Sequence, residues 1–199
     1  MRTRFVLAAA IGTALTLATA ALAEEGKAGL DGIKKAVGAA KVTLGQAIET
    51  AQKEVAAGKV IEAGLETEDG ATFFEVDVLS GDAVKEVKVD AVTRKVLSVK
   101  DEKPEAGEAE ELAGAKKALD AAKLTFPQAV QAAIKAVKDG KAFKIELEMK
   151  DGKPVFEVVL LQGDKAVKAT LDAVTGTVTG TADWQPKTGE KDEEHEGKD

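Results

Sequence analysis

Two aspartates, Asp90 and Asp172, recur in the same setting and could therefore carry chemistry. Residues 89–96 read Val-Asp-Ala-Val-Thr-Arg-Lys-Val, and residues 171–178 read Leu-Asp-Ala-Val-Thr-Gly-Thr-Val. A recurring carboxylate could act as a general acid or base. A carboxylate at a strand end can also accept hydrogen bonds from the backbone N–H groups of the next turn, as a threonine hydroxyl can. We favour the turn interpretation, because duplicated residues at a strand end need only backbone chemistry to explain them.

These two segments define a structural turn motif that closes two equivalent units. Its residues are Asp90, Thr93 and Arg94 in the first unit and Asp172, Thr175 and Gly176 in the second. The glycine predicts a positive φ at this position, which an arginine adopts at a cost of about 1 kcal/mol. We therefore expect Arg94→Gly to stabilise the protein.

Other residues that could support catalysis are few. Glu75, Asp77 and Glu157 could supply the paired carboxylates of a glycoside hydrolase. They alternate with apolar residues, however, which predicts that they lie on the solvated side of half-buried strands. The sequence contains no cysteine, no tyrosine and one histidine, and it has no glycine-rich phosphate loop between a strand and a helix. We predict that the protein is not an enzyme and has no cofactor.

The single histidine, His195, lies among glutamates near the C-terminus. Imidazole and carboxylate groups are metal ligands, but one histidine in a flexible tail lacks the preformed geometry of a selective site. We therefore expect no specific metal site, and at most weak association with divalent cations. The single tryptophan, Trp184, could anchor a partner, although packing just past the last strand is the commoner role.

The N-terminus has the three parts of a secretory signal peptide. Arg2 and Arg4 precede an apolar run, which ends in Ala21-Leu22-Ala23 before two glutamates. We predict a signal peptide over 1–23, cleavage after Ala23, and a periplasmic or secreted protein with no membrane anchor. No cysteine follows the apolar run, which argues against a bacterial lipoprotein anchor. Loss of the two arginines takes the formal charge from −7 to −9, which disfavours binding to nucleic acid or anionic membranes.

An internal duplication sets the architecture. Shifting the chain by 82 positions aligns residues 40–99 with 122–181 without a gap, and roughly two fifths of the aligned positions are identical. Each repeat begins with a capping box, Thr43 with Gln46 and Thr125 with Gln128, followed by apolar residues at helical spacing. Gly58 and Gly140 are expected to stop these helices. Alternating residues with Asp-Gly and Gly-Asp turns then predict an antiparallel meander.

The predicted fold class is α+β, with two tandem small domains. Each domain has one helix packed on an antiparallel sheet of three to four strands. The domains are expected at 26–99 and 111–183. A charged linker with Pro104 and Gly107 is expected at 100–110, and a disordered acidic tail at 184–199.

The repeats resemble the PepSY family. The residues that carry this resemblance are the Phe-Glu-Val strand, at 74–76 and 156–158, and the closing motif at 89–96 and 171–178. The first copy departs from the family pattern at Arg94, where glycine is usual. The resemblance implies an exported domain of the kind found in peptidase propeptides and in stand-alone modules, and it supplies no catalytic residues.

Two functional hypotheses follow. The first is a non-catalytic exported binding protein that modulates or inhibits an envelope or extracellular peptidase, or binds a similar protein partner. Its open sheet edge, or the sheet face opposite the helices, would dock the partner. The second is a periplasmic sensory or divalent-cation-binding module that uses its acidic surface and tail.

Overall fold

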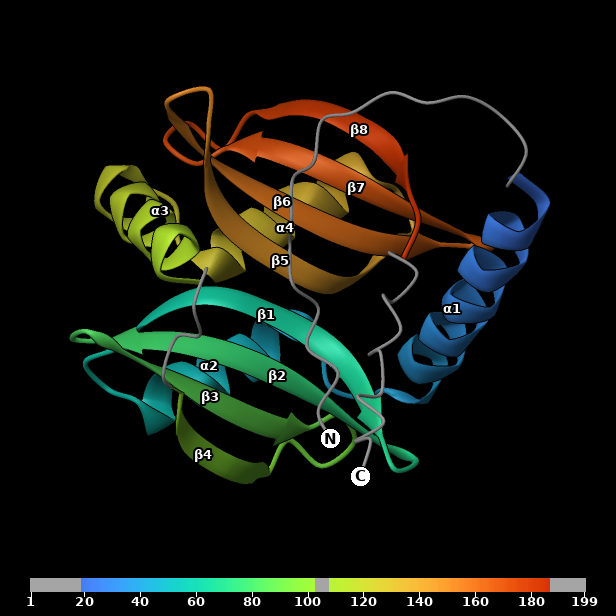
Figure 1. Ribbon diagram of the computed structural model, residues 1–199, viewed down its shortest axis with the longest axis horizontal. Coiled ribbons are helices and arrows are strands. Elements are labelled where there is room, and N and C mark those ends of the chain that lie inside the picture. Colours follow the sequence, from blue (N-terminus) through green and yellow to red (C-terminus); the bar gives the residue numbers. More distant parts are fainter. Residues whose placement is uncertain (1–18, 103–107, 187–199) are drawn as a thin grey trace, which may run out of the picture.

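The computed structural model describes residues 19–102 and 108–186, which form four helices and eight strands (Figure 1). The elements of the first repeat are α1 Thr19–Ala39, α2 Leu44–Glu54, β1 Lys59–Glu68, β2 Ala71–Ser80, β3 Ala83–Asp90 and β4 Val96–Glu102. Those of the second are α3 Glu108–Ala121, α4 Phe126–Ala136, β5 Lys141–Lys150, β6 Lys153–Gln162, β7 Lys165–Asp172 and β8 Val178–Trp184.

Both capping boxes are present. In α2, Gln46 N donates to Thr43 Oγ1 at 3.3 Å, and Thr43 N donates to Gln46 Oε1 at 3.0 Å. Thr125 and Gln128 make the same pair of bonds at the start of α4. These bonds satisfy backbone N–H groups that a helix start leaves unpaired, so the sequence pattern locates both helix starts correctly.

The glycines after these helices have a different role from the one expected. The C-caps are Val55 and Val137, and neither Gly58 nor Gly140 has a positive φ. A Cβ at Gly58 would lie 2.3 Å from Val78 Cγ1, and one at Gly140 would lie 3.0 Å from Leu160 Cδ2. Glycine is required here because the chain passes close to the second strand of each repeat, not because it ends the helix.

The strands form one antiparallel sheet in the order β4-β3-β2-β1-β5-β6-β7-β8. The predicted α+β class is confirmed. The repeats do not form separate sheets, because β1 pairs with β5 through Ala63 and Ile145 at the centre. Pairing of the two first strands removes two free sheet edges, which an isolated small domain would expose.

Helices α2 and α4 cover one face of the sheet, behind it in Figure 1. We call this the helix face and the opposite one the outer face. The main apolar core runs through the helix face of both repeats and includes Ile48, Phe74, Val130, Ile145 and Phe156. Phe126 of α4 meets Phe156 edge-on, with ring centroids 4.9 Å apart. The two repeats therefore share one core, which explains how such short units are stable together.

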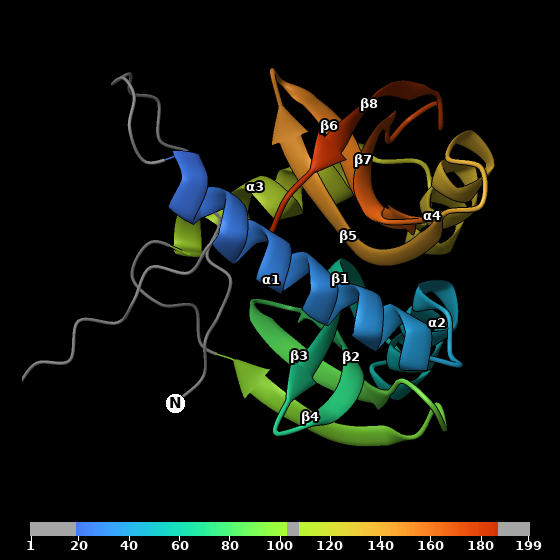
Figure 2. The ribbon, with the colours of Figure 1, turned by 90° about the vertical axis from the view of Figure 1, so that its right-hand side faces the viewer.

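Helix α1 packs on the repeat that it does not belong to in sequence. Its Leu30 and Val37 are buried against Phe143, Val159 and Ala166 in a second apolar cluster on the outer face of the second repeat. The Lys34 ammonium also lies 3.3 Å from Asp164 in the β6–β7 turn. Figure 2 shows α1 crossing in front of both halves of the sheet. This exchange ties the two repeats together and lies outside the sequence prediction.

The boundaries of the predicted segments can be placed only in part. Where the linker 100–110 is expected, β4 extends to Glu102 and α3 begins at Glu108, and residues 103–107 lie outside the described residues. Helix α1 begins at Thr19 and continues past the predicted cleavage position after Ala23. Trp184, the first residue of the expected tail, ends β8. No helix in the described part of the chain is long and apolar enough to cross a membrane.

Candidate functional site

The first copy of the turn motif is held together by one carboxylate. Asp90 Oδ1 accepts bonds from Val92 N at 3.0 Å, from Thr93 N at 2.6 Å and from the Thr93 hydroxyl at 2.7 Å. Together these bonds, led by that of the Thr93 backbone, hold the pKa of Asp90 below its ordinary value. The carboxylate is thus engaged by the turn that follows it.

The second copy repeats this arrangement. Asp172 Oδ1 accepts bonds from Val174 N at 2.9 Å and Thr175 N at 2.8 Å. The backbone bonds from Thr175 and Val174 likewise lower the pKa of Asp172. Gly176 N donates to Asp172 O, and Asp172 N donates to Thr177 O, each at 2.9 Å. This pair of bonds closes a four-residue turn whose last residue, Gly176, has a left-handed φ of 75°.

The left-handed position is occupied differently in the two repeats. Arg94 has a φ of 63° and Gly176 a φ of 75°. A Cβ at Gly176 would lie 2.9 Å from Leu124 Cδ2, whereas the residue equivalent to Leu124 in the first repeat is the smaller Val42. The side chain of Arg94 has room because its neighbour is smaller.

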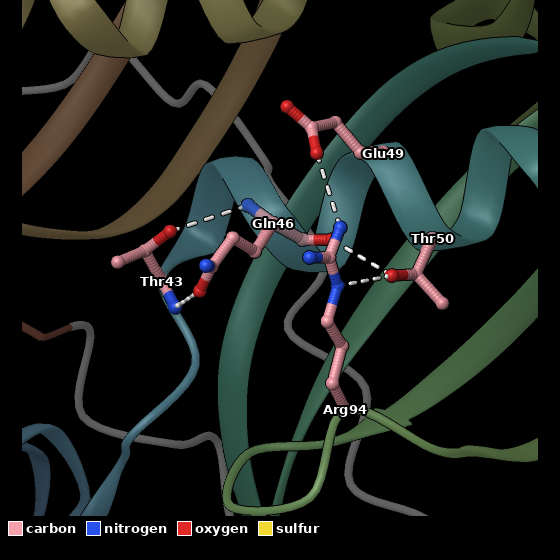
Figure 3. A network of polar contacts seen from close by, with 5 residues as sticks. All are labelled: Thr43, Gln46, Glu49, Thr50 and Arg94. Carbon is pink, nitrogen blue, oxygen red and sulfur yellow. Dashed lines mark hydrogen bonds and ion pairs between the residues drawn. The ribbon is translucent and has the colours of Figure 1, made fainter.

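Arg94 also binds the helix above it. Its Nε donates to Thr50 Oγ1 at 2.8 Å, and one terminal nitrogen donates to Glu49 Oε2 at 3.0 Å (Figure 3). The second repeat has Ala132 and Gln131 at the positions of these partners. The arginine therefore connects the corner to α2 in the first repeat alone, which offsets the strain of its backbone.

These contacts change the expected effect of replacing Arg94. Arg94→Ala keeps the strained φ and loses both bonds, so we expect the free energy of unfolding to fall by about 1–2 kcal/mol. Arg94→Gly loses the same bonds but relieves about 1 kcal/mol of strain, so we expect a nearly neutral change instead of the stabilisation predicted from sequence. Urea unfolding of both variants measures the difference. A clear gain in stability for Arg94→Gly would show that the bonds to α2 contribute nothing.

The outer face carries a line of carboxylates that was not predicted from the sequence. Direct cross-strand pairs connect five acids on the adjacent strands β3, β2, β1, β5 and β6. We call this set the acidic row: Glu86, Asp77, Glu62, Glu146 and Glu157. Like charges directly opposite each other destabilise a sheet, so the row is a costly arrangement.

The candidate acids Glu75, Asp77 and Glu157 do lie on this face, but they are less solvated than predicted. The Glu75 and Glu157 side chains are 23% and 15% exposed. Among the described residues, Asp77 Oδ1 is buried without a hydrogen-bond partner, as is Glu86 Oε1. Only the pairing of strands reveals this, because Glu75 and Asp77 lie on β2 whereas Glu157 lies on β6 in the other repeat. The sequence signal is the alternation of Glu and Asp with apolar residues on β1, β2 and β5.

Burial shifts the acid–base properties of this face. It raises the pKa of Asp77 well above its usual value, with the negative charges of Glu62 and Glu75 adding to the effect. Burial also raises the pKa of Glu75 to about 7 and that of Glu146 to about 7. Glu75 and Glu146 therefore change charge near neutral pH.

Lysines neutralise part of the row. Lys144 Nζ lies 2.5 Å from Glu62 Oε1 across the seam between the repeats. Lys168 Nζ lies 2.7 Å from Glu157 Oε2. Burial tends to raise the pKa of Glu157, but hydrogen bonds from lysines, Lys168 foremost, hold it below its ordinary value. At the other end, Lys88 Nζ is 3.4 Å from Glu75 and 4.0 Å from Glu86.

The remaining sequence candidates do not join this face. His195 lies outside the described residues, so the expected weak cation association stays a prediction. Within 19–102 and 108–186, no group of three or more acidic, histidine or cysteine residues is placed to hold a metal ion. Trp184 meets Phe143 edge-on at 5.7 Å, in the cluster beneath α1.

Comparison with known proteins identifies the repeats. The family model described as PepSY, "Peptidase propeptide and YPEB domain", matches residues 41–100 and 116–182. These segments cover more than half of the chain and coincide with the two structural repeats, and the protein belongs to the PepSY family.

Two further comparisons add little. No curated protein matches the chain. A crystal structure from Clostridium difficile 630, of a protein described as a candidate lipoprotein, is similar with 20% identity and a TM-score of 0.46, covering 73% of this chain and 95% of that one.

Proposed function

We propose that this protein is a non-catalytic, exported PepSY protein that binds and modulates a peptidase of the cell envelope or the extracellular space. The observation that supports this most is the match of both repeats to a family described by its peptidase propeptides. A propeptide domain acts by binding a peptidase, so the stand-alone pair is expected to bind in trans.

The architecture supports binding through a preformed surface. The shared sheet and core hold both repeats in one unit, and α1 of the first repeat is packed on the second. A rigid surface loses little conformational entropy on binding. The two duplicated corners are engaged in backbone bonds, so we assign them a structural role and place recognition elsewhere.

The proposal is tested with the protein immobilised and exposed to an envelope extract of its source organism. We expect a peptidase to be retained, and the purified peptidase to change its rate on a peptide substrate when the protein is added. The Arg94→Ala variant, altered at a corner, should retain the same peptidase. Failure to retain any peptidase, or retention with no change in its activity, would contradict the proposed function.

A further inference from the structure

The two repeats differ most on the outer face. In the second repeat the positions equivalent to Asp77 and Glu86 are Val159 and Lys168. Val159 is buried beneath Leu30 and Val37 of α1, so this face of the second repeat already has an apolar cover from the chain itself. The first repeat places carboxylates at the same positions. Its outer face is therefore suited to a charged occupant rather than to an apolar helix.

Two members of the acidic row, Asp77 and Glu86, each have a buried oxygen that accepts no hydrogen bond from the described residues. Lys144 pairs with Glu62, and Lys168 and Lys150 pair with Glu157. Asp77 and Glu86 are directly opposite each other on β2 and β3, and the Lys88 ammonium lies 4.0 Å from the unbonded oxygen of Glu86. The side chain of Glu86 is 4% exposed. A buried carboxylate that lacks a hydrogen bond is costly, and with Lys88 only as close as 4.0 Å to Glu86 this pair of acids is less closely neutralised than Glu62 or Glu157.

The spacing of the carboxylates in the row favours the lysine or arginine side chains of a polypeptide over a metal ion. Its carboxylates follow one another at the spacing of neighbouring strands, about 4.8 Å, and they do not converge on one point. In keeping with this, the described residues contain no group placed to hold a metal. Within this protein, lysine side chains form the ion pairs with Glu62 and Glu157. Leu79 and Val84, paired one step along the same face, could pack against the methylene stem of such a side chain.

We propose that the acidic row, centred on Asp77 and Glu86, is the surface that recognises the protein partner, and that the partner presents a segment with lysine or arginine side chains to it. This inference rests on the proposed function, because it specifies the chemistry of the partner's docking segment. Partner cations would donate hydrogen bonds to the buried oxygens of Asp77 and Glu86, which accept none from the described residues.

The test uses a fluorescent peptide of alternating arginine and glycine and a second peptide with glutamate in place of arginine, at pH 8 and moderate salt. We expect the arginine peptide to bind the full protein and the glutamate peptide not to bind. The variant Asp77→Asn/Glu86→Gln should weaken binding by about tenfold or more. The control Glu54→Gln/Asp139→Asn removes two carboxylates away from the row and should change affinity less than about twofold.

Several results would overturn the inference. One is equal affinity of the row variant and the control variant for the arginine peptide. Another is binding of the glutamate peptide by the unaltered protein. A third is binding of Ca²⁺ or spermidine at the row without any binding of the arginine peptide. Thermal unfolding checks that the variants fold; if the double variant does not, Asp77→Asn alone carries the test. If the row variant retains the peptidase as strongly as the unaltered protein, the inference fails while the proposed function stands. If the unaltered protein retains none, only the proposed function fails.

Discussion

Gly176→Ala is expected to lower the free energy of unfolding by about 2–4 kcal/mol. The residue has a φ of 75°, where a Cβ costs about 1 kcal/mol. The new Cβ would also lie 2.9 Å from Leu124 Cδ2, and overpacking of this kind costs about 1–3 kcal/mol. For a chain of this length the melting temperature should fall by roughly 5–10 °C.

The first repeat supplies the compensating change. It combines a non-glycine residue, Arg94, with the smaller Val42 at the position of Leu124. Leu124→Val in the Gly176→Ala background should therefore recover part of the loss, although it is itself destabilising alone. Gly180→Ala in β8 is the matched control, because nothing lies within 4 Å of its added Cβ and its φ is not positive. Equal losses at positions 176 and 180 would show that the Leu124 contact and the left-handed φ are unimportant.

Stability is expected to fall as pH rises from about 5 to 8. The pKa values of Glu75 and Glu146 are raised from 4.5 to about 7, so the folded protein keeps protons that the unfolded chain releases. The free energy of unfolding then decreases with pH through this window and levels off above the folded pKa. A pKa unit corresponds to about 1.4 kcal/mol. Allowing for solvent screening of the partly exposed groups, we expect a total loss of about 2–3 kcal/mol.

The groups around these acids define the control. Glu66 and Glu86 raise the pKa of Glu75 and Lys88 lowers it, after the larger effect of burial. Glu75→Gln/Glu146→Gln should flatten the profile between pH 5 and 8, as measured by urea unfolding at each pH. Below pH 4 the slope reverses, because the lowered pKa values of Asp90 and Asp172 give stability that protonation removes. A profile as steep in the double variant as in the unaltered protein would contradict this origin.

Local features of the fold followed from the sequence because local chemistry specifies them. The capping boxes at Thr43 and Thr125 need only residues three positions apart, and the corners at Asp90 and Asp172 need only residues within one turn. The left-handed φ at position 94 was predicted from its counterpart, Gly176. The effect of Arg94 was not, because its partners Glu49 and Thr50 are distant in sequence.

Three features depended on contacts between distant segments. Separate sheets were predicted, yet β1 and β5 pair because each first strand presents an edge that the other can satisfy. The packing of α1 on the second repeat has a sequence signal, the apolar Val159 on the outer side of β6 where β2 has Asp77. The acidic row has a weaker signal, because its five members come from five strands.

The sequence by itself determined the duplication, the α+β units, the helix starts and the closing corners, since these depend on periodicity and on hydrogen bonds within a few residues. Only the tertiary structure decided how the units join, which face α1 covers, and that Asp77 and Glu86 lie directly opposite each other. Strand register places side chains about 5 Å apart whatever their separation along the chain. The corners that repeat so visibly in the sequence are structural, and the surface that we propose for binding lies where the two repeats differ.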